Sequence, residues 1–373
     1  MDRAVARLNG PTAMTDAPAR GSRPARGIRP FRGIRRLVAA ASAALLAVAL
    51  AGCAPAGPWE LTGDLATHDP ALAKQGDTWF VYSTGNGTIA DGNIQVRSSR
   101  DGRSWRYAGE VWDEKPEWLR EAVPGVQNLW APELVEHDGT WYLYYSASTF
   151  GKNTSVIALA TNSTLDPDDP AYEWVDRGVV IASSPSDDFN AIDPGVATDA
   201  DGTPWMAFGS FWSGIREVEL EWPSGLRAGT ADGAGSGAAS GSGEAAAEPL
   251  RLADRGSPPN AIEAPYLLEH DGDWFLFVSR DSCCQAADST YKIAVGRADA
   301  PTGPFVDRDG VPLLEDGGTI LAETDGSRIG PGGQSVADGM MALHYYDGDL
   351  NGQFRLALVP LRWDGDGWPV LDW

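Results

Sequence analysis

The fold of this chain is decided by the stretch 260–279, which reads Asn260-Ala261-Ile262-Glu263-Ala264-Pro265-Tyr266-Leu267-Leu268-Glu269-His270-Asp271-Gly272-Asp273-Trp274-Phe275-Leu276-Phe277-Val278-Ser279. A carboxylate stands before a proline, and an apolar run, an Asp-Gly pair and a second apolar run opening with tryptophan follow. Aromatic and β-branched runs of this length, separated by Asp-Gly, are typical of a β-hairpin. The stretch therefore predicts two neighbouring antiparallel strands.

The second half of this unit occurs five times along the chain. The other copies are Asp77-Thr78-Trp79-Phe80-Val81-Tyr82-Ser83, Asp138-Gly139-Thr140-Trp141-Tyr142-Leu143-Tyr144-Tyr145-Ser146, Asp201-Gly202-Thr203-Pro204-Trp205-Met206-Ala207-Phe208-Gly209-Ser210 and Asp338-Gly339-Met340-Met341-Ala342-Leu343-His344-Tyr345-Tyr346. The markers Trp79, Trp141, Trp205, Trp274 and Met341 are spaced by 62, 64, 69 and 67 residues. Such a period holds about four short strands, which suits a propeller blade rather than a solenoid repeat. The sequence predicts an all-β fold, a five-bladed β-propeller.

A short motif precedes each marker by 8 to 12 residues. The five motifs are His68-Asp69-Pro70, Trp130-Ala131-Pro132-Glu133, Ala191-Ile192-Asp193-Pro194, Ile262-Glu263-Ala264-Pro265 and Gly330-Pro331-Gly332-Gly333-Gln334. Asp-Pro or Glu-Ala-Pro alone is ordinary turn punctuation. Four acidic residues in one phase of a five-fold repeat are harder to explain that way. Because the first strand of each blade lines the axis, we expect Asp69, Glu133, Asp193 and Glu263 to converge.

The N-terminal region has the composition of an export signal. Residues 1–36 carry nine Arg against two Asp, and Leu37–Leu50 is a run of Ala, Leu and Val with one Ser, followed by Ala51-Gly52-Cys53. This pattern resembles a bacterial lipoprotein signal peptide, and the apolar run is shorter than the roughly 20 residues of a spanning helix. We predict a signal peptide at 1–52, lipidation of Cys53, a spacer at 53–63 and the propeller at 64–373. An uncleaved membrane-anchoring segment is the alternative.

Charge and composition limit the kinds of molecule that this protein can bind. Without residues 1–52 the chain keeps 20 basic and 50 acidic residues, a net charge near −30, which disfavours nucleic acid and anionic membrane. The Gly-, Ala- and Ser-rich segment 228–248 cannot bury a core and predicts a flexible insertion. Apart from Cys53, the cysteines are the adjacent pair Cys283 and Cys284, whose spacing offers no zinc site but permits a disulfide.

Acidic residues facing a channel suit one kind of chemistry. The chain has no Gly-x-Ser-x-Gly elbow, P-loop or dinucleotide fingerprint. Glycoside hydrolysis needs one carboxylic acid to protonate the leaving oxygen and one carboxylate to activate water or attack the anomeric carbon. A third carboxylate nearby raises the pKa of the acid and keeps it protonated near neutral pH.

These motifs resemble glycoside hydrolase family 43, and within it the arabinan endo-1,5-α-L-arabinosidases. The resemblance covers the chain from about Asp64 onward. It rests on His-Asp-Pro at 68–70, Asn-Ala-Ile-Asp-Pro at 190–194 and Ile-Glu-Ala-Pro-Tyr at 262–266. Further matches are Gly209-Ser210-Phe211-Trp212-Ser213-Gly214-Ile215, Ser282-Cys283-Cys284, Ser289-Thr290-Tyr291-Lys292-Ile293-Ala294-Val295-Gly296-Arg297, Thr302-Gly303-Pro304-Phe305 and Gly330-Pro331-Gly332-Gly333-Gln334-Ser335.

The resemblance implies an inverting hydrolase. Asp69 is then the general base, Glu263 the general acid, and Asp193 the residue that orients the acid and modulates its pKa. The sugar subsites would be lined by Asn190, Ala191, Ile192, Ser210, Phe211 and Trp212.

Two departures from the family pattern bear on metal and on Glu133. Relatives with an axial metal ion, often calcium, carry a histidine where this chain has Gly333 and Gln334. We therefore expect no required cofactor and no metal, with an axial calcium as the alternative. Glu133 stands where aspartate is more usual, and it is either a structural carboxylate bonded to backbone amides or a substrate contact.

The resulting hypothesis is a lipid-anchored monomer at the outer face of the bacterial cell membrane that cuts internal α-1,5 bonds of arabinan or arabino-oligosaccharides. Membrane contact would be through the lipid only, and nucleic acid is not expected. Two alternatives stay open. One is an exo-acting arabinofuranosidase or β-xylosidase of the same family, and the other is a non-catalytic carbohydrate-binding propeller.

Overall fold

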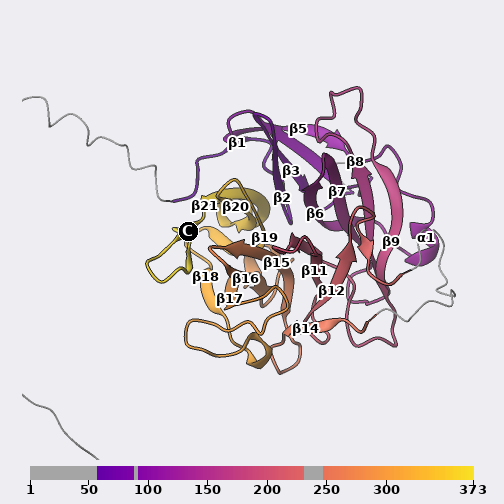
Figure 1. The fold of residues 1–373 in the computed structure, drawn as a ribbon. Helices are drawn as coiled ribbons and strands as arrows, with labels where there is room; N and C mark the ends of the chain where they lie inside the picture. Colours follow the sequence, from indigo (N-terminus) through magenta and orange to yellow (C-terminus); the bar gives the residue numbers. More distant parts are fainter. Residues whose placement is uncertain (1–56, 88–90, 231–246) are drawn as a thin grey trace, which may run out of the picture. The chain divides into compact units, whose positions relative to one another are not determined.

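The computed structural model describes residues 57–87, 91–230 and 247–373. These residues form five sheets around a common axis, with the chain running once around the ring from indigo to yellow (Figure 1). The helical segments are single turns, namely α1 (Leu119–Ala122), η1 (Ala286–Asp288), η2 (Leu313–Glu315) and η3 (Gly348–Leu350). The prediction of an all-β five-bladed propeller is confirmed. In the ranges described, no helix has the length and apolar character needed to cross a membrane.

Each blade is one sheet whose strands run from the axis outward. Blade one contains β2 (Ala71–Gln75), β3 (Thr78–Ser83), β4 (Gln95–Ser99), β5 (Ser104–Glu110) and β1 (Thr62–Gly63). Blade two contains β6 (Leu129–His137), β7 (Thr140–Ala147), β8 (Ser155–Asn162) and β9 (Val175–Ser183). Blade three contains β10 (Gly195–Thr198), β11 (Pro204–Phe208), β12 (Ile215–Glu221), β13 (Leu226–Arg227) and β14 (Leu250–Ala253).

The last two blades complete the ring. Blade four contains β15 (Ile262–His270), β16 (Asp273–Arg280), β17 (Lys292–Ala298) and β18 (Thr319–Ala322). Blade five contains β19 (Arg328–Ala337), β20 (Met340–Asp347) and β21 (Gln353–Pro360), and a separate ribbon pairs β22 (Arg362–Trp363) with β23 (Pro369–Val370). The innermost strands β2, β6, β10, β15 and β19 contact one another in this order, and β19 contacts β2.

The tryptophan markers lie at one structural position. Trp79, Trp141, Trp205, Trp274 and Met341 are each the second residue of the second strand of their blade. Three of the preceding turns are Asp-Gly pairs in which both residues have positive φ, at 138–139, 271–272 and 338–339. That geometry matches the right-handed twist of the flanking strands. The repeat read from the sequence is thus the hairpin of the two inner strands of each blade.

The core is divided into five clusters, one between each pair of neighbouring blades. Alternation along a strand sends successive side chains to opposite faces. In β16, Leu276 faces blade three while Phe275 and Phe277 face blade five. All three side chains are fully buried. Burial on both faces explains why these strands read as continuous apolar runs.

The segment before the first inner strand joins blade one to blade five. The amide of Trp59 donates to the carbonyl of Leu358 in β21, and the amide of Leu356 donates to the carbonyl of Leu65. β1 pairs in parallel with β5. Part of the predicted spacer 53–63 is therefore hydrogen-bonded to both blades that close the ring.

Two predicted segments lie wholly or partly outside the described residues. The signal peptide at 1–52 and the lipidated Cys53 fall in residues 1–56, which the structure does not describe. Of the predicted insertion 228–248, residues 231–246 are not described, and the remainder connects β13 to β14 in blade three.

Candidate active site

Each innermost strand starts near a residue in the left-handed region of backbone space. These residues are Asp69 (φ 50°), Ala131 (φ 37°), Asp193 (φ 59°), Ala264 (φ 50°) and Gly333 (φ 58°). The ladder has irregularities at three of these places, in β6, β15 and β19. For the four residues other than glycine, such backbone conformations cost about 1–3 kcal/mol each, and they cluster at functional sites.

The four acidic residues were expected at equivalent positions of the repeat, and the left-handed residues show that they are not. Asp69 and Asp193 occupy the left-handed position itself, whereas Glu263 stands one residue before it and Glu133 two residues after it. The repeat therefore holds for the backbone but not for the acidic side chains. A one-residue change reverses the direction of a side chain along a strand, so the four carboxylates do not occupy equivalent positions.

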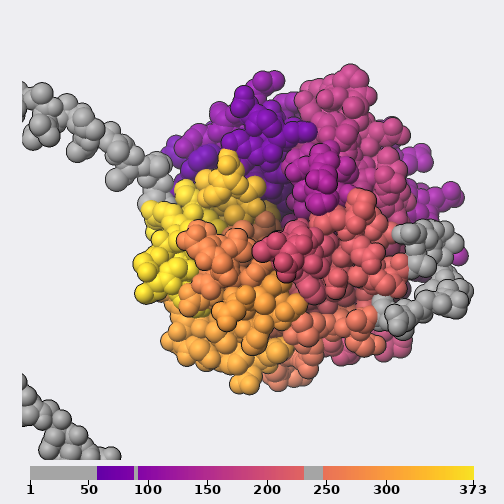
Figure 2. Space-filling model, in the orientation of Figure 1, coloured from indigo at the N-terminus to yellow at the C-terminus, as the bar shows by residue number. Residues whose placement is uncertain are grey.

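A small cavity of about 20 Å³ lies where the five inner strands meet, and it has the room of roughly one water molecule. Its lining includes one residue from each blade, namely Asp69, Glu133, Asp193, Ala264 and Gly333. In the space-filling view, segments of every colour from indigo to yellow surround a hollow near the centre of this face (Figure 2). Of the four acidic residues expected to converge, Asp69, Glu133 and Asp193 line this cavity, whereas Glu263 is adjacent to the lining residue Ala264.

Asp69 is held as a charged carboxylate. Its Oδ2 accepts hydrogen bonds from Nδ1 of His68 at 2.7 Å and from the hydroxyl of Thr84 at 2.6 Å. Burial raises the pKa of Asp69, but the charge and hydrogen bond of His68, together with His344 and Thr84, outweigh it and hold this pKa far below its usual range. The side chain keeps 19% of its surface exposed, and Oδ1 lies 3.5 Å from Nδ1 of His344. This arrangement suits a base.

Asp193 has the opposite environment. Its backbone amide donates to the hydroxyl of Ser146, and its Oδ2 accepts a hydrogen bond of 3.2 Å from the amide of Ala264. Burial and the negative charges of Glu263 and Asp69 raise the pKa of Asp193 well above its ordinary value. The bond to Ala264 ties Asp193 to the residue next to Glu263.

Glu263 is 8% exposed and is fixed at both carboxyl oxygens. Ser210 donates to Oε2 at 2.7 Å, and Tyr291 donates to Oε1 at 2.8 Å. Burial raises the pKa of Glu263, the two hydrogen bonds lower it, the charge of Asp69 raises it again, and the net direction is upward. Asp69, Asp193 and Glu263 are thus close enough to shift one another's pKa values, and two of them are pushed toward the protonated form.

Glu133 is 5% exposed, and its surroundings favour a structural role. Burial raises its pKa well above the ordinary value, and the opposing contribution is a hydrogen bond from the backbone of Val196. Of the two interpretations of this residue, the contact with a backbone amide of the next blade favours the structural carboxylate.

The predicted sugar-lining residues divide into buried and accessible ones. Ala191 is fully buried between blades two and three, Ile192 is 6% exposed, and Asn190 accepts a hydrogen bond from the hydroxyl of Ser155. Ser210 contacts Glu263, and the amide of Phe211 donates to the carbonyl of Ile262. The accessible member of the set is Trp212, which is 39% exposed. The side chain of Ala191 packs in the core, so only its backbone could line a subsite.

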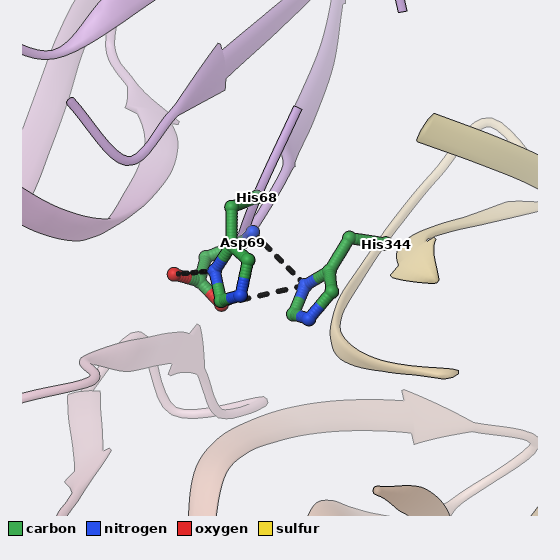
Figure 3. A group of neighbouring side chains, drawn as sticks. All are labelled: His68, Asp69 and His344. Atoms are coloured by element: carbon green, nitrogen blue, oxygen red, sulfur yellow. Dashed lines mark hydrogen bonds and ion pairs between the residues drawn. The ribbon is translucent and has the colours of Figure 1, made fainter. Parts of the chain in front are cut away.

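Two histidines that were not predicted as site residues flank Asp69 (Figure 3). The rings of His68 and His344 are stacked with their centroids 3.7 Å apart. Nδ1 of His344 accepts a hydrogen bond of 3.1 Å from the amide of Asp69. Burial, followed by the charge of His68, lowers the pKa of His344 well below its usual value. His344 is therefore a neutral ring that contacts the base.

His68, Asp69 and His344 also have the residue types of a metal site, with ligand-type atoms within 4.8 Å of one another. Protein partners already take both ring nitrogens of His68 and Nδ1 of His344, and Oδ2 of Asp69 accepts two hydrogen bonds. Calcium prefers six to eight oxygen ligands. With two imidazole rings and a single carboxylate, the three residues do not fit a calcium site.

Gln334 links neighbouring inner strands. Its Oε1 accepts from the hydroxyl of Ser279 at 2.9 Å, and its Nε2 donates to the carbonyl of Ala264 at 2.7 Å. The amide of Gly333 also donates to the Ser279 hydroxyl. The Gly-Gln pair at this position thus joins blade five to the strand that carries Glu263.

Several functional residues are not apparent from the motifs alone. Thr84, Tyr291, His344 and Tyr346 contact the carboxylates or their partners from later strands. His344 and Tyr346 do lie in the fifth copy of the second-strand signature, and this copy alone has a histidine there. The histidine that is present in this copy alone is the sequence feature from which both residues could have been predicted.

Fold and site together define a β-propeller with carboxyl groups gathered at its axis, an arrangement that suits a glycosidase, and sequence comparison gives its family. Residues 62–369 match the glycosyl hydrolases family 43, and the chain belongs to this family. It is 38% identical over 322 residues to the extracellular exo-α-(1→5)-L-arabinofuranosidase of Cellvibrio japonicus, covering 82% of this chain and 86% of that protein. It is also 38% identical over 332 residues to the extracellular endo-α-(1→5)-L-arabinanase 1 of Bacillus subtilis, covering 88% and 95%.

A solved structure shows the same architecture. The endo-arabinanase of family 43 from Bacillus licheniformis superposes with a TM-score of 0.75 at 38% identity. The match covers 84% of this chain and 99% of that one. The resemblance inferred from the motifs is confirmed at the level of the family.

Proposed function

We propose that this chain is an arabinanase that hydrolyses α-1,5-linked L-arabinofuranosyl bonds with inversion and cuts internal bonds of arabinan. The observation that carries this proposal is the contrast between Asp69 and Glu263 on the propeller axis. The pKa of Asp69 is held far below its usual range, and that of Glu263 is raised. Asp69 is therefore favoured as the ionised base, and Glu263 is shifted toward the protonated form that a general acid needs.

The chemistry follows from these two states. Oδ1 of Asp69 takes a proton from a water molecule, and the water oxygen attacks the anomeric carbon on the face opposite the leaving group. Glu263 gives its proton to the glycosidic oxygen, whose bond to the anomeric carbon breaks. Asp193 disfavours ionisation of Glu263 by its own negative charge whenever it is ionised, and it accepts a hydrogen bond from Ala264. After turnover, Asp69 is protonated by the proton from the attacking water, and Glu263 is ionised. Proton exchange with solvent restores the starting state of both groups.

The substrate class is supported by the relatives, which are named for α-(1→5)-arabinan or arabinofuranoside cleavage. Equal identity to an exo-acting and an endo-acting enzyme leaves the cutting mode to the shape of the groove. A second cavity of about 330 Å³ begins at Trp212 and continues along Asp254 and residues 256–260. Trp212 follows Ser210, the partner of Glu263, by two residues. A cavity of this size, two residues along the chain from the Ser210–Glu263 contact, is the feature that favours endo action, and exo action is the second candidate.

The test is the time course of products from linear 1,5-arabinan, with the Glu263→Gln protein as control. Early mixtures of oligosaccharides of several lengths are expected for endo action. Arabinose alone from the first time point would assign the exo class. Proton NMR of the first products should show the anomer opposite to that of the substrate bond. Binding without cleavage of arabinan or aryl arabinofuranosides would replace the hydrolase with a sugar-capture protein.

We also propose that the protein is exported and lipid-anchored through Cys53, acts as a monomer and needs no metal. Support for export comes from the sequence of residues 1–53 and from the extracellular relatives. Expressed in a bacterium, the protein should partition into the detergent phase of Triton X-114, and Cys53→Ser should move it to the aqueous phase. Equal partitioning of the two proteins would remove the anchor.

A further inference from the structure

A chain of hydrogen bonds leads from a surface loop to the proposed base. The amide of Cys284 donates to the hydroxyl oxygen of Tyr346 at 2.7 Å. That hydroxyl lies 2.9 Å from Nε2 of His68, and Nδ1 of His68 lies 2.7 Å from Oδ2 of Asp69. Three contacts therefore connect residue 284 with residue 69 across blades four, five and one.

The first contact constrains the direction of the others. Because the Cys284 amide can only donate, Tyr346 accepts there, and its own proton is available to Nε2 of His68, with the Ser289 side chain as a further partner of the hydroxyl. In the singly protonated form of His68, Nε2 then accepts from Tyr346, and the ring proton resides on Nδ1 and is donated to Asp69. Oδ2 of Asp69 is thereby occupied by His68 and Thr84, and neither of these hydrogen bonds involves Oδ1.

The loop that presents Cys284 is held in an unusual conformation. Cys283 and Cys284 form a disulfide between adjacent residues, and Cys284 has φ 64°, in the left-handed region that non-glycine residues seldom adopt. Its Sγ lies 4.0 Å from Nε2 of His68. The amide of Thr290 donates to the carbonyl of Ser282, so the two ends of the loop are joined.

The loop also packs tightly on blade five. A Cβ atom added at Gly352 would lie 2.4 Å from the amide nitrogen of Ala287, so only glycine permits this approach. Cys284 itself is exposed, and the disulfide is accessible to a reductant. The disulfide is thus exposed to solvent, and it is connected to Asp69 through the contacts of Cys284 with Tyr346 and of Tyr346 with His68.

We propose that Tyr346 is a positioning residue for the general base, and that the Cys283–Cys284 disulfide holds the amide that sets the direction of the Tyr346 hydroxyl. The expected effect on kcat rests on the proposed function, whereas the effect of Tyr346 on the tautomer of His68 does not. Tyr346 acts through His68, fixing which ring nitrogen carries the proton and therefore which oxygen of Asp69 is left for water. Reduction of the disulfide releases the Cys284 amide and loosens the same chain of contacts.

The direct test is nitrogen NMR of the full protein labelled with ¹⁵N-histidine. The chain has four histidines, and the His68 signals are identified by their loss in His68→Gln. The wild type should show a proton on Nδ1 and none on Nε2. In Tyr346→Phe, and in wild type reduced with a phosphine, a population with a proton on Nε2 should appear. A His68 that is doubly protonated in the wild type, or unchanged in Tyr346→Phe, overturns the proposal.

The kinetic test separates positioning from sugar contact. Tyr346→Phe should lower kcat on linear arabinan about tenfold with KM within twofold, because a misplaced base affects the chemical step. Reduction should lower kcat of the wild type but not that of Tyr346→Phe. The matched control is Tyr345→Phe, whose ring packs on Trp373, away from His68, and which should behave as wild type. A rise in KM with unchanged kcat would make the loop a substrate contact instead.

The two proposals fail separately. A wild-type protein that cleaves no arabinan defeats the proposed function, while the histidine spectra still decide whether Tyr346 sets the tautomer of His68. Thermal unfolding of each variant shows whether it folds. Cys284→Ser removes the disulfide without a reductant and is therefore a second way to test the effect of the cross-link.

Discussion

The hydroxyl of Tyr291 donates a hydrogen bond of 2.8 Å to Oε1 of Glu263. The two residues belong to the same blade but to strands separated by β16, since Tyr291 immediately precedes β17. Tyr291 is 2% exposed, and a Cβ atom at Gly332 would lie 2.1 Å from its ring. The hydroxyl is therefore locked on the proposed acid, and it stabilises the ionised form of Glu263.

Tyr291→Phe should move the alkaline limb of the pH–rate profile to higher pH. A donor to the carboxylate lowers its pKa, so removal of the donor raises the pKa of Glu263, and the acid keeps its proton to higher pH. The measurement is kcat/KM against pH. The control is Tyr144→Phe, which loses a buried hydrogen bond to the carbonyl of Gly225 in another blade. A limb that moves to lower pH would contradict this role of Tyr291.

Glu263→Gln should lose at least a hundredfold in kcat on arabinan, because general acid catalysis contributes about 10²–10⁴-fold. Binding of arabino-oligosaccharides should persist, since the amide keeps the shape of the carboxyl group. Aryl arabinofuranosides with good leaving groups need less proton donation and should be hydrolysed much better than arabinan. Equal losses on both kinds of substrate would speak against an acid role.

Asp69→Asn should fall by a similar factor on both kinds of substrate. Water must be activated whatever the leaving group, so a reactive aryl group cannot compensate for a missing base. Parallel assays of the two variants on arabinan and on one aryl arabinofuranoside give the comparison. Full rescue of Asp69→Asn by the aryl substrate would remove the base assignment.

Gly333→Ala tests how closely the axis is packed around the base. A Cβ atom at Gly333 would lie 2.5 Å from Oδ1 of Asp69 and 2.8 Å from Nδ1 of His344, so it must displace them. We expect kcat to fall more than tenfold. Gly339→Ala in the next turn has a similar φ of 74° and nothing within 4 Å of the added atom. It should cost only the roughly 1–2 kcal/mol of a left-handed alanine and leave kcat unchanged. Equal kcat values in the two variants would contradict the packing argument.

The repeat could be predicted from the sequence because its information is local. Trp79, Trp141, Trp205 and Trp274 mark the same strand position in four blades, and the Asp-Gly turns define the hairpins. Asp69, Asp193 and Glu263 could be predicted for the same reason. Asp69 and Asp193 directly precede a proline, and Glu263 stands two residues before one, near the start of an inner strand. Their convergence at the axis follows from the geometry of any propeller.

The partners of these carboxylates could not be predicted because they depend on tertiary contacts. Thr84 and Tyr291 reach Asp69 and Glu263 from elsewhere in the same blade, whereas His344 reaches Asp69 from blade five. The position of each acidic residue relative to the left-handed residue of its strand could not be predicted either. It depends on which residue adopts positive φ, and Ala131 and Ala264 give no compositional sign of doing so.

Glu217 provides a prediction about stability rather than catalysis. It is 1% exposed in β12, and within the described part of the chain neither carboxyl oxygen has a hydrogen-bond partner. Burial raises its pKa from 4.5 to about 9. Between these two values the folded protein holds a proton on Glu217 that the unfolded chain has released. Stability from this group therefore decreases as pH rises through that window, by roughly 1 kcal/mol per pH unit.

Glu217→Gln removes this dependence, because an amide does not titrate. The variant should gain stability relative to wild type as pH rises from 5 to 8, by a difference of a few kcal/mol over that range. Glu219→Gln, two residues along the same strand at an exposed position, is the matched control and should show no such trend. Urea unfolding of the three proteins at several pH values measures the effect. If the difference between Glu217→Gln and wild type stayed constant with pH, Glu217 would have to be ionised within the fold, with a partner that compensates its charge.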